Sequence, residues 1–220
     1  MTIYEPATLL TDLLLAALAS GLAWRLKSHA QAGATAMGWW SGALGLTALS
    51  ALVGGSYHGF APNLPPAIAD AWWLATLLII GALSAVMALS LMHELVPPGR
   101  RKYWRGLIIF KFAAFAGAAT VYPAFIVAII DYGLTMFAWA VAALLTRRAW
   151  RHGMLAAITL SALAALVQQL HWGVSAQFNH NDLYHVVQAL ALVAFYRAGR
   201  AFSNAARVKE DGAAAENLPT

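Results

Sequence analysis

The stretch GGSYHGFAPNLPPAIAD, which runs from Gly54 to Asp70, holds the first side chains that could perform chemistry. It places a hydroxyl at Ser56, an imidazole at His58 and a carboxylate at Asp70 between two long apolar segments. An imidazole can bind a metal ion, and a carboxylate can accept a proton from water. The stretch is therefore either a polar turn or one part of an active site.

A second polar stretch, NHNDLYHVVQAL, begins at Asn179. Asn181 and Asp182 precede His185 by four and three residues, so the three share one face of a helix, which Gln188 extends by a turn. A polar stripe of this kind faces other helices rather than lipid. The stretch predicts either a helix that contributes ligands to a site or a helix capped by one of its own polar residues.

Two further charged residues, Lys111 and Asp131, fall inside apolar segments. Such residues pair with one another or serve a function, because an isolated charge in hydrocarbon is costly. Neighbouring segments carry them at comparable depth, so we expect a structural ion pair that fastens two helices together. Asp70 also has a structural explanation, because the helix dipole stabilises a carboxylate in the first turn of a helix.

The composition places these residues in a membrane protein. Hydrophobic residues make up 61% of the 220 residues and charged residues only 10%, whereas soluble domains carry about 25% charged residues. The chain contains no cysteine, which excludes disulfides, a thiolate nucleophile and cysteine ligands. Any metal ion must therefore be held by His, Asp, Glu or Asn.

The apolar pattern predicts an all-α fold, a bundle of seven transmembrane helices within residues 1–203. A span needs about 20 apolar residues, and Pro123 divides the longest apolar block because proline interrupts a helix. The expected spans are residues 6–26, 36–59, 68–95, 104–121, 124–146, 153–171 and 182–203. Residues 204–220 are polar and rich in alanine, which predicts a disordered cytoplasmic tail.

The basic residues predict the orientation of this bundle. All of them except Lys111 fall in the loops, the adjoining span ends or the tail on one side. Basic loops face the cytoplasm, so we expect the N-terminus outside and the C-terminus inside, in a bacterial inner membrane. The basic excess thus reflects topology and does not indicate a nucleic-acid partner. Tryptophans near helix ends, including Trp40 and Trp150, predict an interfacial belt.

This topology brings four of the seven histidines to the outer face. His58 ends the second span, His171 ends the sixth, and His180 and His185 open the seventh. Asp70 opens the third span at the same face. We therefore expect a polar site at the periplasmic or external end of the bundle.

The order of these residues resembles the superfamily of alkaline ceramidases, adiponectin and progestin receptors, and haemolysin III-type proteins, often called CREST. Its members are seven-helix membrane proteins that share Ser-x-x-x-His in helix two, Asp in helix three and His-x-x-x-His in helix seven. The three histidines bind zinc in the characterised members, which hydrolyse lipid amides. The external N-terminus is most similar to the ceramidase branch.

The resemblance implies roles for four residues. His58 and His185 match zinc ligands in helices two and seven, and Asp70 matches the acid in helix three. His180 is the expected third ligand, one position from where the family has its other histidine. The implied chemistry is a zinc-activated water that attacks the acyl carbonyl of a ceramide-like amide or an ester, with a membrane lipid as the substrate.

Two departures from the family motif affect the remaining roles. Asn181 stands where the family has histidine, and Gly54 stands where it has serine. Ser56, two residues further on, could reach the site as an oxyanion donor only if the two preceding glycines loosened the helix end. Additional candidates for the site are Asn181, Asp182, His171 and Tyr57.

Other functions are open at the level of the sequence. The departures at Gly54 and Asn181 fit a receptor-like relative that keeps the fold without the chemistry. Two histidines on separate helices could also hold a haem in an electron-transfer protein, or belong to a transporter. Metal analysis separates zinc from haem, and a lipid-amide assay separates an enzyme from a receptor.

Overall fold

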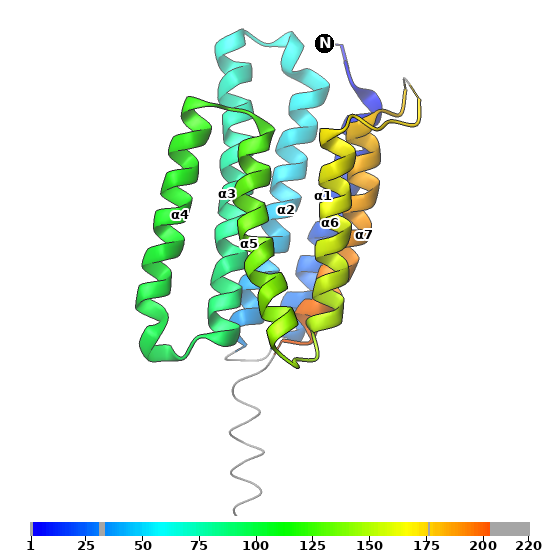
Figure 1. Ribbon diagram of the computed structural model, residues 1–220. Coiled ribbons are helices and arrows are strands. Elements are labelled where there is room, and N and C mark those ends of the chain that lie inside the picture. Colours follow the sequence, from blue (N-terminus) through cyan, green and yellow to red (C-terminus); the bar gives the residue numbers. More distant parts are fainter. Residues whose placement is uncertain (1, 31–33, 176, 203–220) are drawn as a thin grey trace, which may run out of the picture.

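A computed structural model describes residues 2–30, 34–175 and 177–202, and this part of the chain is all-helical (Figure 1). Its seven α-helices are α1 (Pro6–His29), α2 (Thr35–Phe60), α3 (Pro66–Leu95), α4 (Arg101–Val121), α5 (Phe125–Leu145), α6 (Arg151–Gln169) and α7 (His180–Arg200). Short 3-10 turns, Ala61–Asn63 and Pro98–Arg100, precede α3 and α4. Each of these helices begins and ends within three residues of the bounds expected for its span. The tail expected over residues 204–220 lies outside the described residues.

Helices α1 to α6 are long and apolar enough to cross a membrane. Helix α7 is less apolar because it carries the polar stripe on one face, and Arg197 and Arg200 in its last turn. Between α4 and α5 the chain breaks at Tyr122 and Pro123, as the proline predicts. Several long apolar helices of this kind are typical of a multi-pass membrane protein.

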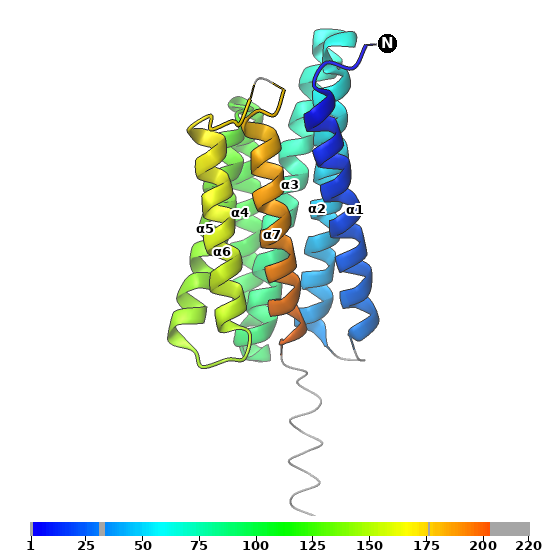
Figure 2. The ribbon, with the colours of Figure 1, turned by 90° about the vertical axis from the view of Figure 1, so that its right-hand side faces the viewer.

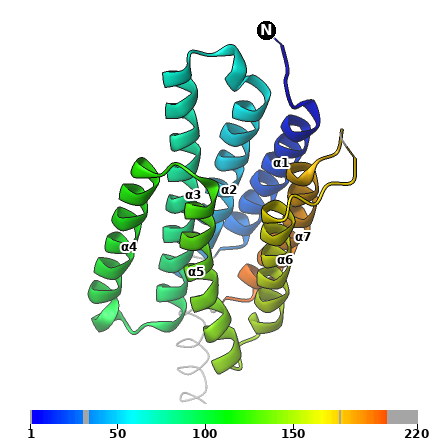
Figure 3. The same cartoon turned by 45° about the horizontal axis from the view of Figure 1, so that its top comes forward.

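Six of these helices form a ring. Helix α1 packs against α2 and α7, α3 packs against α2 and α5, and α6 packs against α5 and α7. Figure 2 shows α7 between α1 and α6, and Figure 3 shows α4 on the outside, where it contacts α3 and α5. The ring leaves room for a cavity at its centre.

A cluster of aromatic side chains closes the end of the ring where α2 begins. The centroid of the Trp40 indole ring lies 5.0 Å from the ring centroid of Trp139, 5.5 Å from that of Phe195 and 5.4 Å from that of Phe202. Trp40 and Trp150 are only 1% exposed. The prediction that these two tryptophans belong to an interfacial belt is therefore wrong. They fill the interior because their indole N–H groups find partners there, the Phe195 carbonyl for Trp40 and Glu94 for Trp150.

The hairpin of α2 and α3 projects past the hairpin of α4 and α5 (Figure 1). Helix α3 has 30 residues, whereas α5 has 21. At about 1.5 Å per residue, this difference leaves the first turns of α3 standing clear of the neighbouring helix ends. Residues in those turns are therefore more exposed than they would be if all the helices ended at the same level.

Candidate functional site

The ring surrounds a half-open cavity of about 900 Å³. Its polar lining gathers at the end of the bundle where α1, α5 and α7 begin, which we call the mouth end. Below the mouth end the wall is mainly apolar, with side chains from α3, α5 and α6 such as Leu83, Met136 and Ile158. A concave space of this size, apolar with a few polar groups at one end, suits a lipid or another small molecule with a long apolar part.

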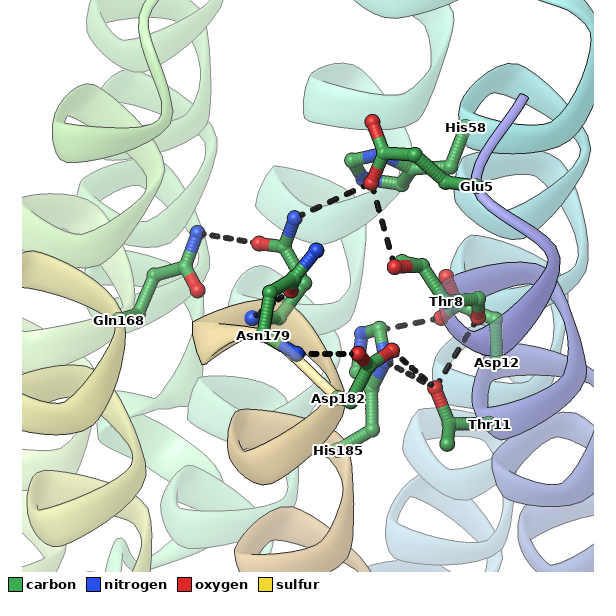
Figure 4. Close-up of polar contacts among 10 residues, drawn as sticks. Glu5, Thr8, Thr11, Asp12, His58, Gln168, Asn179, Asp182 and His185 are labelled. Atoms are coloured by element: carbon green, nitrogen blue, oxygen red, sulfur yellow. Dashed lines mark hydrogen bonds and ion pairs between the residues drawn. The ribbon is translucent and has the colours of Figure 1, made fainter. Parts of the chain in front are cut away.

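His185 is held between two side chains of α1 at the mouth end (Figure 4). Its Nε2 lies 3.1 Å from Asp12 Oδ1, and its Nδ1 lies 3.0 Å from the hydroxyl oxygen of Thr11. His185 and Asp12 are both buried, and both line the cavity. A buried imidazole beside a buried carboxylate has a fixed orientation and can exchange a proton with it.

The position of Asp12 depends on a glycine in α2. Helices α1 and α2 approach so closely at Gly55 that a Cβ atom there would overlap the Cβ of Asp12. Glycine is the residue that permits such close approach of a backbone to a neighbouring group. Gly55 therefore supports the site from the stretch that also carries His58, while α2 stays helical through it.

Replacing Gly55 with alanine is expected to push α1 away and to separate Asp12 from His185. Overpacking of a close contact costs roughly 1–3 kcal/mol, so the midpoint of thermal unfolding in detergent should fall. Gly45→Ala is the matched control, because a Cβ at Gly45 meets nothing within 4 Å. Equal unfolding midpoints for the two variants would show that the contact does not constrain α1.

Glu5 joins three helices just above this pair (Figure 4). Its Oε2 lies 3.4 Å from His58 Nδ1, 3.2 Å from the hydroxyl oxygen of Thr8 and 3.5 Å from Asn181 Nδ2. The Glu5 side chain is 42% exposed, so its attraction to His58 is weakened by solvent. His58 is thus placed at the cavity by its helix and is only loosely tied to Glu5.

The start of α7 is built by a capping box. The backbone N–H of Asn179 donates to Asp182 Oδ2 at 2.7 Å, and the N–H of Asn181 donates to Asn179 Oδ1 at 2.8 Å. Asp182 is fully buried, so its carboxylate has the capping role rather than that of a ligand. Gln168 Nε2 donates to Asn181 Oδ1 at 2.9 Å, which ties α6 to the same mouth.

The other two histidines of this face lie beside each other. The rings of His171 and His180 have centroids 4.6 Å apart. His180 lines the cavity, as do His58 and His185. His171 is exposed and has a left-handed backbone, with φ of 54°. The structure thus brings His58, His180 and His185 to one end of the cavity.

Besides Asp182 and His171, three expected site residues do not line this cavity within the described part of the chain. The hydroxyl of Ser56 donates to the Leu52 carbonyl at 2.7 Å, because the glycines before it stay helical and leave it pointing away. Asp70 is exposed in the projecting turns of α3. Tyr57 packs against Trp73, with ring centroids 5.1 Å apart.

The donor set at the mouth end suits zinc in its chemistry. Imidazole is a preferred zinc ligand, and hydrolytic sites use three protein ligands with a water in the fourth position. The carboxylate of Asp12 beside His185 is the kind of partner that orients a ligating histidine. Among the described residues, however, no three His, Asp or Glu side chains are already gathered closely enough to hold a metal ion. Binding would require these side chains to turn toward one another.

Sequence reasoning did not assign Asp12, Thr11 or Glu5 to the site. The available signal for Asp12 was its position as an ionisable residue within a span. Glu5 and Thr11 gave no comparable signal, because polar residues near the start of a helix are common. Their roles follow from the contact of α1 with α7, which spacing along the chain does not reveal.

Comparison with known proteins gives a family but no described function. No curated protein and no solved structure matches the chain. One family model matches residues 7–204, which covers all seven helices but the first residue of α1. The chain therefore belongs to this family, the family of unknown function DUF6962.

Proposed function

We propose that the chain is a membrane-embedded hydrolase that cleaves lipid amides or esters at the mouth end. The observation that carries the proposal is the cavity of about 900 Å³, which joins Asp12, His58 and His185 to an apolar wall. The wall accepts an acyl chain, and the polar end meets the acyl carbonyl. Lipid is the proposed substrate class because five of the six helices that line the cavity, all except α7, are long and apolar enough to cross a bilayer.

The side chains have distinct tasks in this proposal. A water molecule attacks the acyl carbonyl carbon and forms a new C–O bond while Asp12 accepts its proton. The side-chain N–H of Asn181, whose 3.5 Å contact with Glu5 is long, donates to the carbonyl oxygen as negative charge develops there. The bond to the leaving nitrogen or oxygen then breaks, and the proton passes from Asp12 to that atom. The products are a fatty acid and an amine or alcohol.

Zinc is the proposed cofactor, with His58, His180 and His185 as the residues that would hold it. Bound there, zinc would polarise the carbonyl and acidify the water. The chain's own residues keep Asp12 beside His185 and surround the acyl chain with a mainly apolar wall. The resemblance to alkaline ceramidases supports this assignment through two of its positions, His58 and His185.

The proposed topology has seven spans, with α7 as the seventh. The polar face of α7 points to the cavity and to α1, so it need not meet lipid. The distribution of basic residues supports an external N-terminus and a cytoplasmic C-terminus. The mouth end would then open to the periplasm or the outside of a bacterial inner membrane.

Elemental analysis tests the zinc assignment. We expect about one zinc ion per purified chain, as for a site with three histidine ligands, and loss of most of it in His58→Ala and in His185→Ala. His152→Ala is a suitable control, since His152 lies at the opposite end of the bundle, in the first turn of α6. Less than about half a zinc per chain, unchanged in both ligand variants, would refute the metal assignment.

A further inference from the structure

The cavity at the centre of the ring is exposed along one side. In the described part of the chain, every cavity-lining residue on α1, α2, α3 and α7 is buried or half-buried. The exposed lining residues all belong to α5 and α6, and they are Gly133, Phe137, Ala162, Leu166 and Gln169. Phe137 is 69% exposed and Leu166 is 52% exposed. Residues that line a cavity and are also widely exposed mark the place where it opens, so the cavity opens between α5 and α6.

This opening, which we call the α5–α6 slot, follows one face of each helix. Ala162, Leu166 and Gln169 are spaced by four and three residues, and Gly133 and Phe137 by four, so each set shares a helix face. Figures 1 and 3 show α5 and α6 diverging from their short connection toward the mouth end. Gln169 is the last residue of α6, at the mouth. Phe137 lies twelve residues into α5, about 18 Å below the mouth end.

The middle of the slot is bordered by two small residues. Gly133 is eight residues from the start of α5, and Ala162 is seven residues from the end of α6. Because the two helices are antiparallel, both residues lie about 10–12 Å below the mouth end. A Cβ atom at Gly133 would meet nothing within 4 Å. A larger side chain at either position could therefore occupy the slot without displacing its neighbours.

The chemistry of the slot suits an acyl chain. Its border is apolar except for Gln169, which lies at the level of the polar mouth. Helices α5 and α6 are both long and apolar enough to cross a membrane, so side chains exposed halfway along them face hydrocarbon. A lipid can slide its chain sideways through the slot while its headgroup stays level with the mouth. A polar solute would have to leave water to use this route, at a high cost.

We propose that the α5–α6 slot is the entrance through which a bilayer lipid passes its acyl chain into the cavity. The proposal rests on the proposed function, in which the ligand of the cavity is a lipid. The hydrocarbon core of a bilayer is about 30 Å thick, so a slot that reaches about 18 Å below the mouth spans little more than one leaflet. The substrate is therefore a lipid resident in the leaflet beside the mouth end, taken from the membrane rather than from water.

Photolabelling in a bilayer tests the entrance without requiring catalysis. The protein is reconstituted into nanodiscs that contain phosphatidylethanolamine with a photoreactive diazirine in the middle of one acyl chain, irradiated, and analysed by mass spectrometry. Ser50 on α2 is half-buried and lines the cavity across the ring from α6, so its labelling reports a chain inside the cavity. Leu52 is 47% exposed and is not among the cavity-lining residues described, so it reports surrounding lipid. We expect both residues to be labelled in the unmodified chain.

Variants assign the labelling of the cavity to the slot. Gly133→Trp and Ala162→Trp obstruct it from its two sides, and each should lose most of the labelling at Ser50 while keeping that at Leu52. Gly117→Trp on α4 is the matched control, because Gly117 is also exposed and a Cβ there also meets nothing within 4 Å. It should keep the full ratio of Ser50 to Leu52 labelling. An unchanged ratio in both slot variants, or no labelling of Ser50 in the unmodified protein, would overturn the proposal.

The outcome separates the entrance from the enzyme. Labelling of Ser50 that both slot variants abolish, in a protein that releases no fatty acid from any lipid, would sustain the entrance and refute the hydrolase. Fatty-acid release that both slot variants leave unchanged, together with an unchanged labelling ratio, would sustain the hydrolase and refute the entrance.

Discussion

Replacing Asp12 with asparagine is expected to reduce lipid hydrolysis by about 10²–10⁴-fold, the usual contribution of a general base. Asparagine keeps the size of the side chain and a carbonyl oxygen that can face His185, but it cannot accept a proton from water. The close packing of α1 at Gly55 should be preserved, so unfolding of the variant in detergent should match that of the unmodified chain. The measurement is the rate of fatty-acid release from a lipid amide.

Asp70→Asn is the informative comparison for this prediction. The resemblance to ceramidases assigns the acid to Asp70, whereas the structure leaves Asp70 exposed in the projecting turns of α3 and buries Asp12 beside His185. We expect full activity in Asp70→Asn. Loss of activity in Asp70→Asn with normal activity in Asp12→Asn would contradict the assignment of Asp12 as the general base. It would assign that role to Asp70 instead.

Replacing Lys111 with methionine is expected to destabilise the protein by about 3–5 kcal/mol, because it leaves a buried carboxylate without its counter-charge. Lys111 Nζ lies 2.6 Å from Asp131 Oδ1 and donates to the Ser84 hydroxyl at 2.9 Å. The pair fastens α4, the outermost helix, to α5 and α3. The midpoint of denaturant unfolding in detergent measures the effect.

A double variant separates the ion pair from other effects at this position. Lys111→Met combined with Asp131→Leu removes both charges, and replacement of a whole buried pair by apolar residues is often neutral. We therefore expect the double variant to recover most of the lost stability. A loss below about 1 kcal/mol in Lys111→Met alone would show that the pair behaves as an exposed one. Neither residue is among the described cavity-lining residues, so zinc content should not change.

The helices were predictable because their signals are local. Apolar length, the proline at position 123 and the polar hairpin around Pro65 and Pro66 mark helix ends directly in the sequence. The pairing of Lys111 with Asp131 was predictable as well, since two opposite charges at equal depth on successive helices have few other partners. These features require no knowledge of how distant helices align.

The site was only partly predictable because it depends on that alignment. His58 and His185 reach the cavity as spacing indicates, but Asp70 does not, because α3 extends past its neighbours. Asp12 reaches His185 because Gly55 lets α1 approach α2 and because α1 packs on α7. Side-by-side contact of the first and last helices is a property of the closed ring, which the sequence pattern does not encode locally.

The tryptophans show the same limit in another way. Position near a helix end predicts an interfacial residue, and Trp104 and Trp172 are half-exposed, as such a residue would be. Trp40 and Trp150 have the same kind of position but turn inward, where they pack with Trp139 and Phe202. Depth along a helix is visible in the sequence, whereas the direction of a side chain around a ring of six helices is not.

Hydrolysis in ¹⁸O-labelled water tests the central claim most directly. The purified protein is incubated with matched lipid amides and lipid esters, and the released fatty acids are analysed by mass spectrometry. The account predicts fatty acid with one ¹⁸O atom from at least one of these lipids, and a loss of this product in Asp12→Asn and in His185→Gln. Absence of fatty-acid release from every lipid, or equal release by both variants, would contradict it.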